Sequence, residues 1–474
     1  MISTYLGPLY LPVETSVREL DSKLLLAAAA LTKGFIVLVG KKGPIKKNAL
    51  LIGQGVYLHK SHMDSADIQY ISELFEKGIS ITALDEEGLV QPSMEYYTRT
   101  RVGDGEIFKY LCRTFSWGEV QETWLKSIKK SNSTRIVITG NPRFDLLREP
   151  YRKIFSEKVK LIRDKFSDFI LVNTNFSAGN FSSSYRVSYI EFMRSNGFLT
   201  RKSDEQYYVD NEMYYRSLFK EYVKAVKSIS KSIPSLNIVI RPHPSEDNST
   251  WLNEFRNYPN VHVESEGNVV NWILASMAVI HTGCTTGIEA FIANKLVLRY
   301  HPIYNDDFEL PLPNSLGESY SSLELLIERL KLLISVNFEV KPDLDKDSQL
   351  KNYIANFDGE FAYERILDSI KKFAVQLPSS KFTNNVLVSI PFTKKITKSM
   401  VNLVRENENL FISFLSDSTY EKLSKQTKKF PGITQEKVEL TLNRIYSVSE
   451  DLINPGYSIK QVDTDLFAII PTLK

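Results

Sequence analysis

Gly283 and Gly287 enclose the short sequence most able to do chemistry, because one cysteine and two threonines stand between them. The apolar run at 276–280 before them is typical of a buried parallel strand, and an apolar helical pattern follows. We therefore predict a strand, a tight turn and a helix that begins near Thr285. Backbone N–H groups and hydroxyl groups at such a helix start can hold a phosphate. An ordinary helix cap formed by Thr285 or Thr286 explains the same residues.

A second predicted strand is followed by an arginine and a histidine. The apolar residues 236–240 are followed by Arg241, Pro242, His243 and Pro244. The two prolines restrict the backbone, so the histidine is held in place. Ligands of open α/β sheets collect at the carboxyl ends of the strands, where both turns would lie. We expect the arginine, the histidine and the threonine pair to share one anion; a histidine bonded only to backbone is the alternative.

Three consecutive carboxylates end the strand predicted at 79–84, namely Asp85, Glu86 and Glu87. Like charges this close raise one another's pKa, which makes the three residues candidates for a general base. The residue types do not choose among them. An acidic turn, or a helix N-terminus whose dipole favours acids, is the alternative.

Polar residues at other predicted strand ends are further candidates to face a substrate. In chain order they are Glu14, Arg18, Arg143, Asp145 and Asn173. The first two occupy the loop and first helical turn where a dinucleotide-binding fingerprint would stand, and no GxGxxG occurs there. Asp145 follows the strand predicted at 135–139, and a role as hinge or cap is its alternative.

The composition is that of an ordinary globular protein of two or three domains, with 474 residues, 43% of them hydrophobic and 24% charged. A net charge of +3 gives no sign of a nucleic-acid-binding surface. Two cysteines are too few for a disulfide framework or a zinc site, which suits a cytoplasmic protein. The N-terminus lacks the pattern of a signal peptide, and we expect no membrane span.

Two local lysine clusters stand out against this balanced charge. They are Lys41, Lys42, Lys46 and Lys47, and then Lys394, Lys395 and Lys398. Solvated surface explains both clusters; peripheral contact with an anionic membrane or glycolipid is the alternative.

Strands and helices alternate from residue 5 to about residue 335, which predicts an α/β protein with two Rossmann-like domains. We expect an N-terminal domain at 1–150, a second domain at 151–375 and a mainly helical C-terminal extension at 376–474 with a small β element at 466–470. Within them we predict a strand at 49–52 and a long loop at 176–210, where a lid or an acceptor contact would lie, and then a long helix that begins at Met213.

Taken together, the motifs resemble the bacterial surface carbohydrate biosynthesis protein family. They are PVE at 12–14, RELDSKLL at 18–25, DEEG at 85–88, TGNPRFD at 139–145, RPHP at 241–244 and GCTTGIE at 283–289. More distantly, the acidic-acidic-glycine, His-Pro and paired-hydroxyl motifs are similar to those of GT-B transferases that use CMP-activated acidic sugars, namely sialyl-, polysialyl- and Kdo transferases. The resemblance covers most of the chain, is weakest after residue 375, and implies two domains that face a cleft.

The resemblance also implies a glycosyltransferase of surface polysaccharide synthesis, which passes an acidic sugar from CMP to a glycan or lipid-linked acceptor. His243 would donate a hydrogen bond to the leaving phosphate. Thr285 and Thr286 would hold that phosphate, and Glu289 would take ribose hydroxyls. Arg241 would pair with the phosphate or with the sugar carboxylate. Because CMP has one phosphate, no metal and no cofactor are expected.

Glu86 or Glu87 would remove the acceptor proton. A retaining double displacement also needs a nucleophile, for which Asp145 is the candidate, and similarity to Kdo and pseudaminic acid transferases favours retention. One alternative is an enzyme like UDP-N-acetylglucosamine 2-epimerase, which would bind UDP. Another is a non-catalytic partner in polysaccharide assembly. Which acidic sugar is used, the linkage and the oligomeric state do not follow from the sequence.

Overall fold

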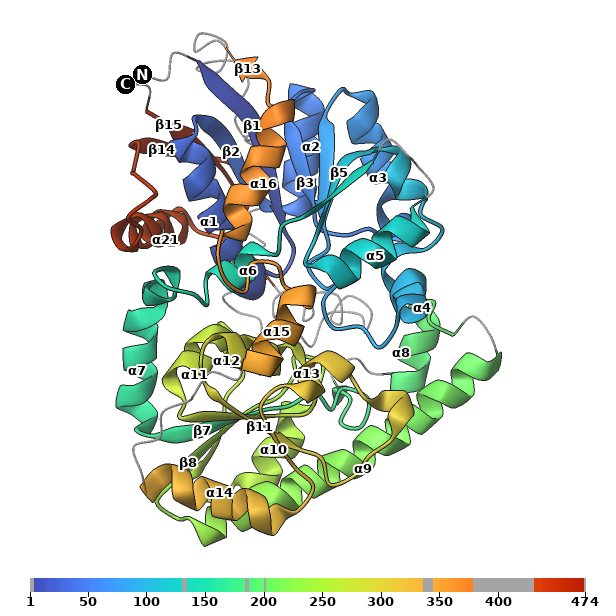
Figure 1. The fold of residues 1–474 in the computed structure, drawn as a ribbon, viewed down its shortest axis with the longest axis vertical. Coiled ribbons are helices and arrows are strands. Elements are labelled where there is room, and N and C mark those ends of the chain that lie inside the picture. Colours follow the sequence, from blue (N-terminus) through green and yellow to red (C-terminus); the bar gives the residue numbers. More distant parts are fainter. Residues whose placement is uncertain are drawn as a thin grey trace, which may run out of the picture. The chain divides into compact units, whose positions relative to one another are not determined.

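The computed structural model describes residues 4–129, 134–183, 187–199, 202–335, 344–377 and 430–472. The chain forms two compact units (Figure 1). The first unit comprises Met1–Ile154 and Ser348–Lys474, and the second comprises Phe155–Asp347. The residues after 347 therefore belong to the first unit, whereas the sequence analysis assigned residues up to 375 to the second domain.

A mainly parallel sheet forms the centre of the first unit. Its strand order is β14-β15-β2-β1-β3-β4-β5-β6, and β13 also pairs with β1. Strands β1 to β6 run parallel to one another, whereas β13, β14 and β15 are antiparallel to their neighbours. The strands are β1 Tyr5–Val13, β2 Phe35–Lys41, β3 Val56–His59, β4 Ser80–Leu84, β5 Leu111–Ser116, β6 Arg135–Ile138, β13 Gln376–Leu377, β14 Tyr457–Asp463 and β15 Leu466–Pro471.

The helices of the first unit bury their apolar faces against this sheet. Residues 24–31 of α1 are all leucine or alanine and all buried, as expected for a helix covered on every side. Helices α2, α3 and α5 share one core cluster with strands β1 to β4. The helices are α1 Ser16–Thr32, α2 Lys42–Ile52, α3 Asp64–Glu76, α4 Met94–Tyr97, η1 Thr98–Val102, η2 Glu106–Lys109, α5 Glu119–Ile128, α6 Pro142–Asp145, η3 Tyr151–Phe155, α15 Leu344–Tyr353, α16 Ala362–Ile370, η6 Lys371–Phe373 and α21 Gln435–Val448.

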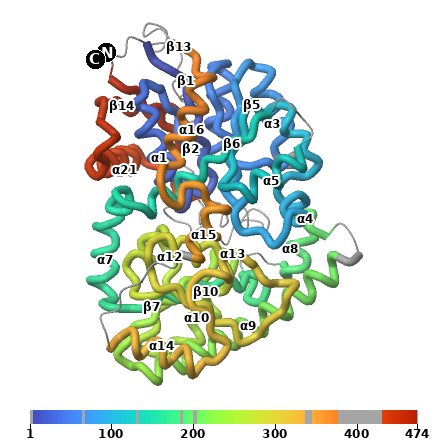
Figure 2. The backbone as a smooth tube through the Cα atoms, in the orientation of Figure 1, coloured from blue at the N-terminus to red at the C-terminus, as the bar shows by residue number. Residues whose placement is uncertain are grey.

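The C-terminal residues, red in Figure 2, extend the first sheet. Strand β15 pairs with β2, with Phe467 opposite Val39 and Ile469 opposite Val37. The sequence analysis predicted a small β element at 466–470 but missed β14 and the pairing with β2. The described part of 376–474 is therefore a mixture of strands and one helix that completes the first unit, and not a mainly helical extension.

The second unit has a wholly parallel sheet with the strand order β12-β11-β10-β7-β8-β9. The chain enters at the central strand β7, winds outward through β8 and β9, and then returns to wind the other way from β10 to β12. This is the order of a Rossmann fold. The strands are β7 Phe169–Asn173, β8 Asn237–Arg241, β9 Val261–Val263, β10 Ala278–His281, β11 Leu296–Tyr300 and β12 Glu318–Tyr320.

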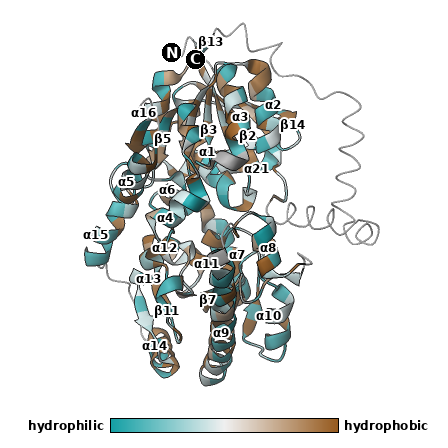
Figure 3. Cartoon of the chain, turned by 90° about the vertical axis from the view of Figure 1, so that its right-hand side faces the viewer, coloured by the Kyte–Doolittle hydropathy of each residue, from teal (hydrophilic) through white to brown (hydrophobic). Residues whose placement is uncertain are grey.

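Helices cover both faces of the second sheet. Alternate strand residues belong to different core clusters: Ile170 and Val172 pack with α9, α10 and α14, while Leu171 packs with α7, α11 and α12. Helix α9 carries both hydrophobic and hydrophilic residues (Figure 3). The helices are α7 Ser156–Phe166, α8 Tyr189–Ser195, α9 Lys202–Ser232, α10 Asn248–Phe255, α11 Val269–Ala275, α12 Thr285–Ile292, η5 Asp306–Phe308, α13 Pro311–Ser315 and α14 Leu323–Ser335. The predicted α/β class with two Rossmann-like units is confirmed.

The strand predicted at 49–52 is wrong, because these residues form the end of α2. Short apolar runs do not distinguish a strand from a buried helix turn. Within α2, Lys42 pairs with Asp67 and Lys46 with Glu73, so the first lysine cluster is partly neutralised by α3. The cluster at 394–398 lies outside the described residues.

The long loop predicted at 176–210 is also partly wrong. Helix α8 occupies Tyr189–Ser195, capped by Ser188, and α9 begins at Lys202, well before the expected start at Met213. The polar, aromatic composition of this region hid its helical spacing. In the part of the chain described, no helix has the length and apolar character needed to cross a membrane.

Candidate functional site

The winding direction of the second sheet changes between β7 and β10. Loops after these two strands run to opposite faces, which leaves an opening at the carboxyl ends where ligands of such sheets bind. Asn173 at the end of β7 is in register with His281 of β10 on one side and with Arg241 of β8 on the other. Three of the strand ends singled out in the sequence therefore meet at this edge.

Helix α12 begins at this edge without a side-chain cap. Its N-cap residue is Cys284, whose sulfur is a weak acceptor beside the N–H groups of Thr286 and Gly287, whereas Asp247 and Asn268 cap α10 and α11 of the same unit through side-chain oxygens. The first N–H groups of a helix have no partner within the helix, and the helix dipole adds positive potential there. Asn173 Nδ2 donates to Thr286 Oγ1 at 2.8 Å, which fixes that hydroxyl beside the helix start. The arrangement suits an anion.

Two glycines allow the turn into α12. Gly283 has a φ of 77°, which residues with a side chain rarely adopt. Gly287 packs directly on the His281 ring, and a Cβ added to Gly287 would lie 2.7 Å from His281 Cε1. His281 Nδ1 accepts the Gly283 N–H at 3.0 Å, and burial lowers the pKa of this histidine to about 4, so the ring is neutral. The buried imidazole is thus a support for the turn.

This packing makes Gly287→Ala a test of the turn. The added methyl group has no room beside His281, so we expect the unfolding free energy to fall by about 1–3 kcal/mol. Urea unfolding measures the change. Gly43→Ala in α2 is the control: a Cβ there meets nothing within 4 Å, and we expect no loss of stability. Equal stability of the two variants would contradict the close packing of α12 on His281.

His243 is exposed at the end of β8, and two serine hydroxyls contact its Nδ1. Nδ1 lies 2.9 Å from Ser177 Oγ and 2.6 Å from Ser245 Oγ. Ser177 belongs to the loop after β7, so the loops of two neighbouring strands orient the imidazole. A histidine that is exposed but oriented is suited to contact a ligand, as its motif predicted.

Glu246 positions His243 and was given no role in the sequence analysis. Its buried carboxylate accepts the backbone N–H of His243 at 3.1 Å and that of Phe176 at 2.9 Å. It also accepts from Thr174 Oγ1 at 2.7 Å and from Trp251 Nε1 at 2.9 Å. Burial raises the pKa of Glu246, against the effect of these donors. An acid just after His-Pro-Ser, with a tryptophan five residues on, is the signal that could have indicated this role.

Arg241 and Glu289 do not take the positions predicted for them. The buried Arg241 guanidinium donates to the carbonyl oxygens of Glu266 at 2.8 Å and Gly267 at 3.1 Å. It also lies 5.0 Å from the Trp272 ring centre. Arg241 therefore anchors the loop after β9, which corrects its predicted contact with a phosphate or a sugar carboxylate. Glu289 is 5% exposed within α12, and its predicted contact with ribose hydroxyls stays a prediction.

The first unit has its own change of winding direction, between β1 and β3. Glu14 after β1 and Lys60 after β3 form an ion pair there with an N–O distance of 2.6 Å. Glu19 of α1 is buried and accepts the Glu14 N–H at 2.8 Å. Arg18 Nη2 donates to Glu87 at 2.8 Å. Three predicted site residues, Glu14, Arg18 and Glu87, thus belong to one charged network.

The three consecutive carboxylates differ in exposure and in partners. Asp85 is buried and is bound by two nitrogens of Arg101. Glu86 is buried and pairs with Lys23 Nζ at 2.6 Å. The side chain of Glu87 is 50% exposed. Glu87 is therefore the one acid of this turn that a substrate can reach.

Neighbouring cations, and not mutual repulsion, decide the pKa of Glu86 and Glu87. Burial alone raises the pKa of a carboxyl group. For Glu86, the charges of Lys23 and Arg143 outweigh burial and lower the pKa to about 2. For Glu87, the charges of Arg18 and Arg101 lower it to about 2 as well. For Glu86 and Glu87 this corrects the expectation of raised pKa values, because each of the two lies beside cations.

The buried pair of Lys23 and Glu86 can be tested by a double-mutant cycle. Removing one partner leaves an uncompensated buried charge, so we expect Lys23→Met and Glu86→Gln each to cost about 3–5 kcal/mol of unfolding free energy. The double variant should lose far less than the sum of the two. Chemical unfolding of all four proteins measures this, and additive losses would contradict the pairing.

The same pair predicts a pH dependence. A carboxyl whose pKa falls from the ordinary 4.5 to about 2 on folding adds stability above about pH 4.5. That stability is lost as the pH falls toward 2. The double variant should therefore lose less stability over this range than the wild type.

Asp145 is a helix cap, which corrects its predicted role as a nucleophile. It is wholly buried and accepts the N–H groups of Ala362 and Tyr363 at the start of α16, both at 3.0 Å. Asn356 Nδ2 also donates to it at 2.6 Å. Burial raises the pKa of Asp145 to about 6. Arg143, two residues earlier in the chain, is also buried. Its guanidinium donates to the Glu86 carbonyl oxygen at 3.2 Å and so supports the acidic turn at 85–87.

Lys23 and Arg101 were missed as members of the charged network. Lys23 lies within the motif at 18–25, one helical turn beyond Glu19, and this spacing could have indicated it. Arg101 has no comparable signal, because the irregular helix η1 brings it to Asp85. Among the residues that the structure describes, no group of three or more His, Cys, Asp or Glu side chains is arranged to hold a metal ion.

Comparisons with known proteins give remote likenesses only. No protein-family model matches the chain, and no curated protein matches it. Among solved structures, the UDP-GlcNAc 2-epimerase of Methanocaldococcus jannaschii has a TM-score of 0.47 at 12% identity, over 77% of this chain and 99% of that chain. The wall teichoic acid polymerase TagF has a TM-score of 0.48 at 12% identity, over 77% and 87%. The Neisseria meningitidis epimerase bound to UDP-GlcNAc has a TM-score of 0.47 at 12% identity, over 77% and 99%. At these values the likeness carries no argument about activity.

Proposed function

We propose that the protein is a glycosyltransferase whose donor is a sugar joined to a nucleoside monophosphate. The observation that carries the proposal is the start of α12, which lies uncapped at the point where the winding of the second sheet reverses. Thr286, held by Asn173 at the end of β7, follows β10, and the exposed His243 follows β8 on the other side of β7. A phosphate bound there would meet backbone N–H groups, a hydroxyl and an imidazole, which is a set that stabilises a leaving phosphate.

The charge at this edge favours one phosphate over two. Arg241, the cation expected to contact the phosphate, is committed to backbone carbonyls and to Trp272. The helix start supplies only a fraction of a unit charge, and His243 supplies at most one. A diphosphate would bring more negative charge than these groups balance without a metal ion. A donor with a single phosphate matches them better, and among sugar nucleotides this points to CMP.

His243 would act through Nε2, because Nδ1 is the nitrogen that Ser177 and Ser245 contact. A hydrogen bond from Nε2 to the phosphate strengthens as the sugar departs and negative charge builds on the phosphate oxygens. Glu246 holds the His243 backbone, so the ring needs little rearrangement during the reaction.

In the first unit, the proposal assigns the acceptor proton to Glu87. It is the exposed acid of its turn, and its lowered pKa keeps it ionised at neutral pH. The cations that lower its pKa also make Glu87 a weak base. It would therefore take the proton only after the acceptor hydroxyl has begun to bond to the sugar, when that hydroxyl has become acidic. With Asp145 used as a helix cap, no second carboxylate is assigned as nucleophile. The proposal therefore changes from retention to inversion of the anomeric centre.

The sugar and the acceptor come from the motif resemblance alone. We propose an acidic sugar of the Kdo or nonulosonate type and a glycan or lipid-linked acceptor of bacterial surface polysaccharide. A metal-independent reaction, a cytoplasmic location and peripheral membrane contact remain predictions of the same proposal.

Nucleotide selectivity tests the proposal directly. A ligand that binds only the folded protein adds RT ln(1 + [L]/Kd) to its stability, about 2.7 kcal/mol at a hundred times Kd. We expect CMP to raise the unfolding temperature, and CDP, UDP and GDP to raise it less, with no change on adding EDTA. A preference for UDP would favour a sugar-nucleotide epimerase instead. No response to any nucleotide would favour a non-catalytic role.

Substitutions at His243 separate its two nitrogens. His243→Ala should lose about 100- to 1000-fold in turnover, measured as CMP released from a CMP-sugar, with little change in unfolding temperature because the side chain is exposed. Gln places an amide near Nε2, whereas Asn places one near Nδ1, so His243→Gln should keep more activity than His243→Asn. Near-wild-type turnover of His243→Ala would contradict the proposed mechanism.

A further inference from the structure

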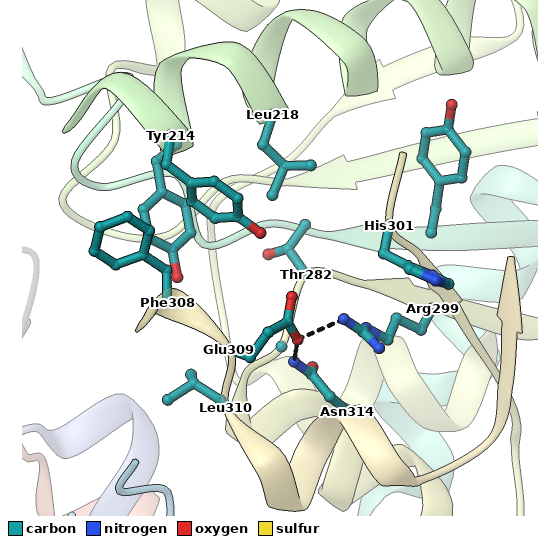
Figure 4. A pocket seen from close by; sticks show the side chains of 12 residues that line it. Tyr214, Leu218, Thr282, Arg299, His301, Phe308, Glu309, Leu310 and Asn314 are labelled. Atoms are coloured by element: carbon teal, nitrogen blue, oxygen red, sulfur yellow. Dashed lines mark hydrogen bonds and ion pairs between the residues drawn. The ribbon is translucent and has the colours of Figure 1, made fainter. Parts of the chain in front are cut away.

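A pocket of the second unit adjoins the start of α12 (Figure 4). Thr282 and Gly283, which form part of its wall, directly precede the N-cap residue Cys284. The pocket is partly open to solvent. Any group joined to a phosphate at the helix start would therefore have this pocket within reach.

Two polar atoms of the pocket wall are buried without a hydrogen-bond partner. They are Thr282 Oγ1 and Asn314 Oδ1. Leaving a buried polar atom unpaired costs about 1–3 kcal/mol, so natural proteins pair nearly all such atoms. Two such atoms in one pocket wall are available to pair with a ligand. An amide oxygen only accepts hydrogen bonds, and a threonine hydroxyl accepts or donates.

Two side chains of opposite charge in the pocket wall, Arg299 and Glu309, form an ion pair. Arg299 Nη2 lies 2.5 Å from Glu309 Oε2, and Asn314 Nδ2 donates to the same oxygen. Both partners of this ion pair are nearly buried, with 12% and 14% of their side chains exposed. The pair also fixes the Asn314 amide, so that Oδ1 is the atom left for a ligand. Such a wall does not attract a carboxylate or a second phosphate.

Aromatic side chains form the opposite part of the wall. Tyr214 of α9 lies 5.2 Å from Phe308, measured between ring centroids, and both line the pocket. Figure 4 shows their rings on one side and Glu309 with Asn314 on the other. An apolar ring face beside hydrogen-bond acceptors fits the edge of a ring that carries hydroxyl groups.

We infer that this pocket binds the hydroxyl-bearing edge of a ring joined to the phosphate at α12, with Thr282 and Asn314 as the specificity-determining acceptors. The inference rests on the proposed function and names the part of the donor that the pocket recognises. That ring is either the ribose of the nucleotide or the transferred sugar. In the second case the pocket takes the hydroxyl groups of the sugar, and not its carboxylate.

Thr282→Val tests the inference, because valine keeps the shape and removes the hydroxyl. Loss of an unpaired buried hydroxyl should leave the unfolding temperature of the ligand-free protein unchanged or raised, which a structural hydroxyl would not do. Affinity for the ligand should fall about three- to tenfold, the equivalent of one neutral hydrogen bond. Thr123→Val is the matched control, since its exposed hydroxyl bonds only to its own helix at Glu119.

Titrations with inorganic phosphate, CMP and CMP-sialic acid, followed by thermal stabilisation, separate the two sources of the ring. Weaker binding of CMP by Thr282→Val assigns the pocket to the ribose. Unchanged binding of CMP with weaker binding of CMP-sialic acid assigns it to the sugar. Inorganic phosphate should bind both proteins equally.

Other outcomes overturn the inference. Equal affinity of Thr282→Val and the wild type for all three ligands would refute the pocket while leaving the proposed function intact. An equal loss for inorganic phosphate would mean that the substitution distorts the helix start, and would also refute it. If none of the three ligands stabilises the wild type, both the pocket and the proposed function fail.

Discussion

Everything in the candidate site follows from a reversal in the order of parallel strands. A parallel sheet that grows outward from a central strand must send the loops after two neighbouring strands to opposite faces. In the second unit these strands are β7 and β10, and in the first unit they are β1 and β3. At both places the two loops diverge and leave an opening at the carboxyl ends of the strands. The polar groups of several loops converge at this opening. Each unit uses this opening differently.

Ion pairs dominate the opening of the first unit, although Arg18 Nε and Glu19 Oε1 have no hydrogen-bond partner there. Lys23, Lys60 and Arg101 compensate the acids beside them, and two half-exposed carboxylates, Glu14 and Glu87, remain within reach of solvent. In the second unit the helix start has no cap, and Thr282 and Asn314 carry unpaired atoms. Ion-paired side chains favour a rigid, stable edge of the sheet. Polar groups without a partner lower the stability of the fold and are retained where a ligand pairs them.

Sequence patterns predicted elements well where burial alone decides them. Strands β4, β8 and β10 are apolar runs bounded by turn residues, and all three were predicted close to their observed positions. The failures need knowledge of distant partners. Residues 49–52 are as apolar as a strand but extend α2, and the pairing of β15 with β2 joins residues more than four hundred positions apart. Arg241 and Asp145 were expected to face a substrate, yet partners that sequence spacing does not reveal hold both inside the protein.

The pairing of β15 with β2 also sets an order of events during synthesis. Because the first unit consists of Met1–Ile154 and Ser348–Lys474, its sheet stays incomplete until the strand Leu466–Pro471 has left the ribosome. Phe155–Asp347, in contrast, is one continuous segment and is free to fold earlier. Until then the apolar strand β2 has an uncovered edge, the kind of edge that promotes aggregation. The nascent chain would therefore depend on chaperones for longer at its beginning than in its middle.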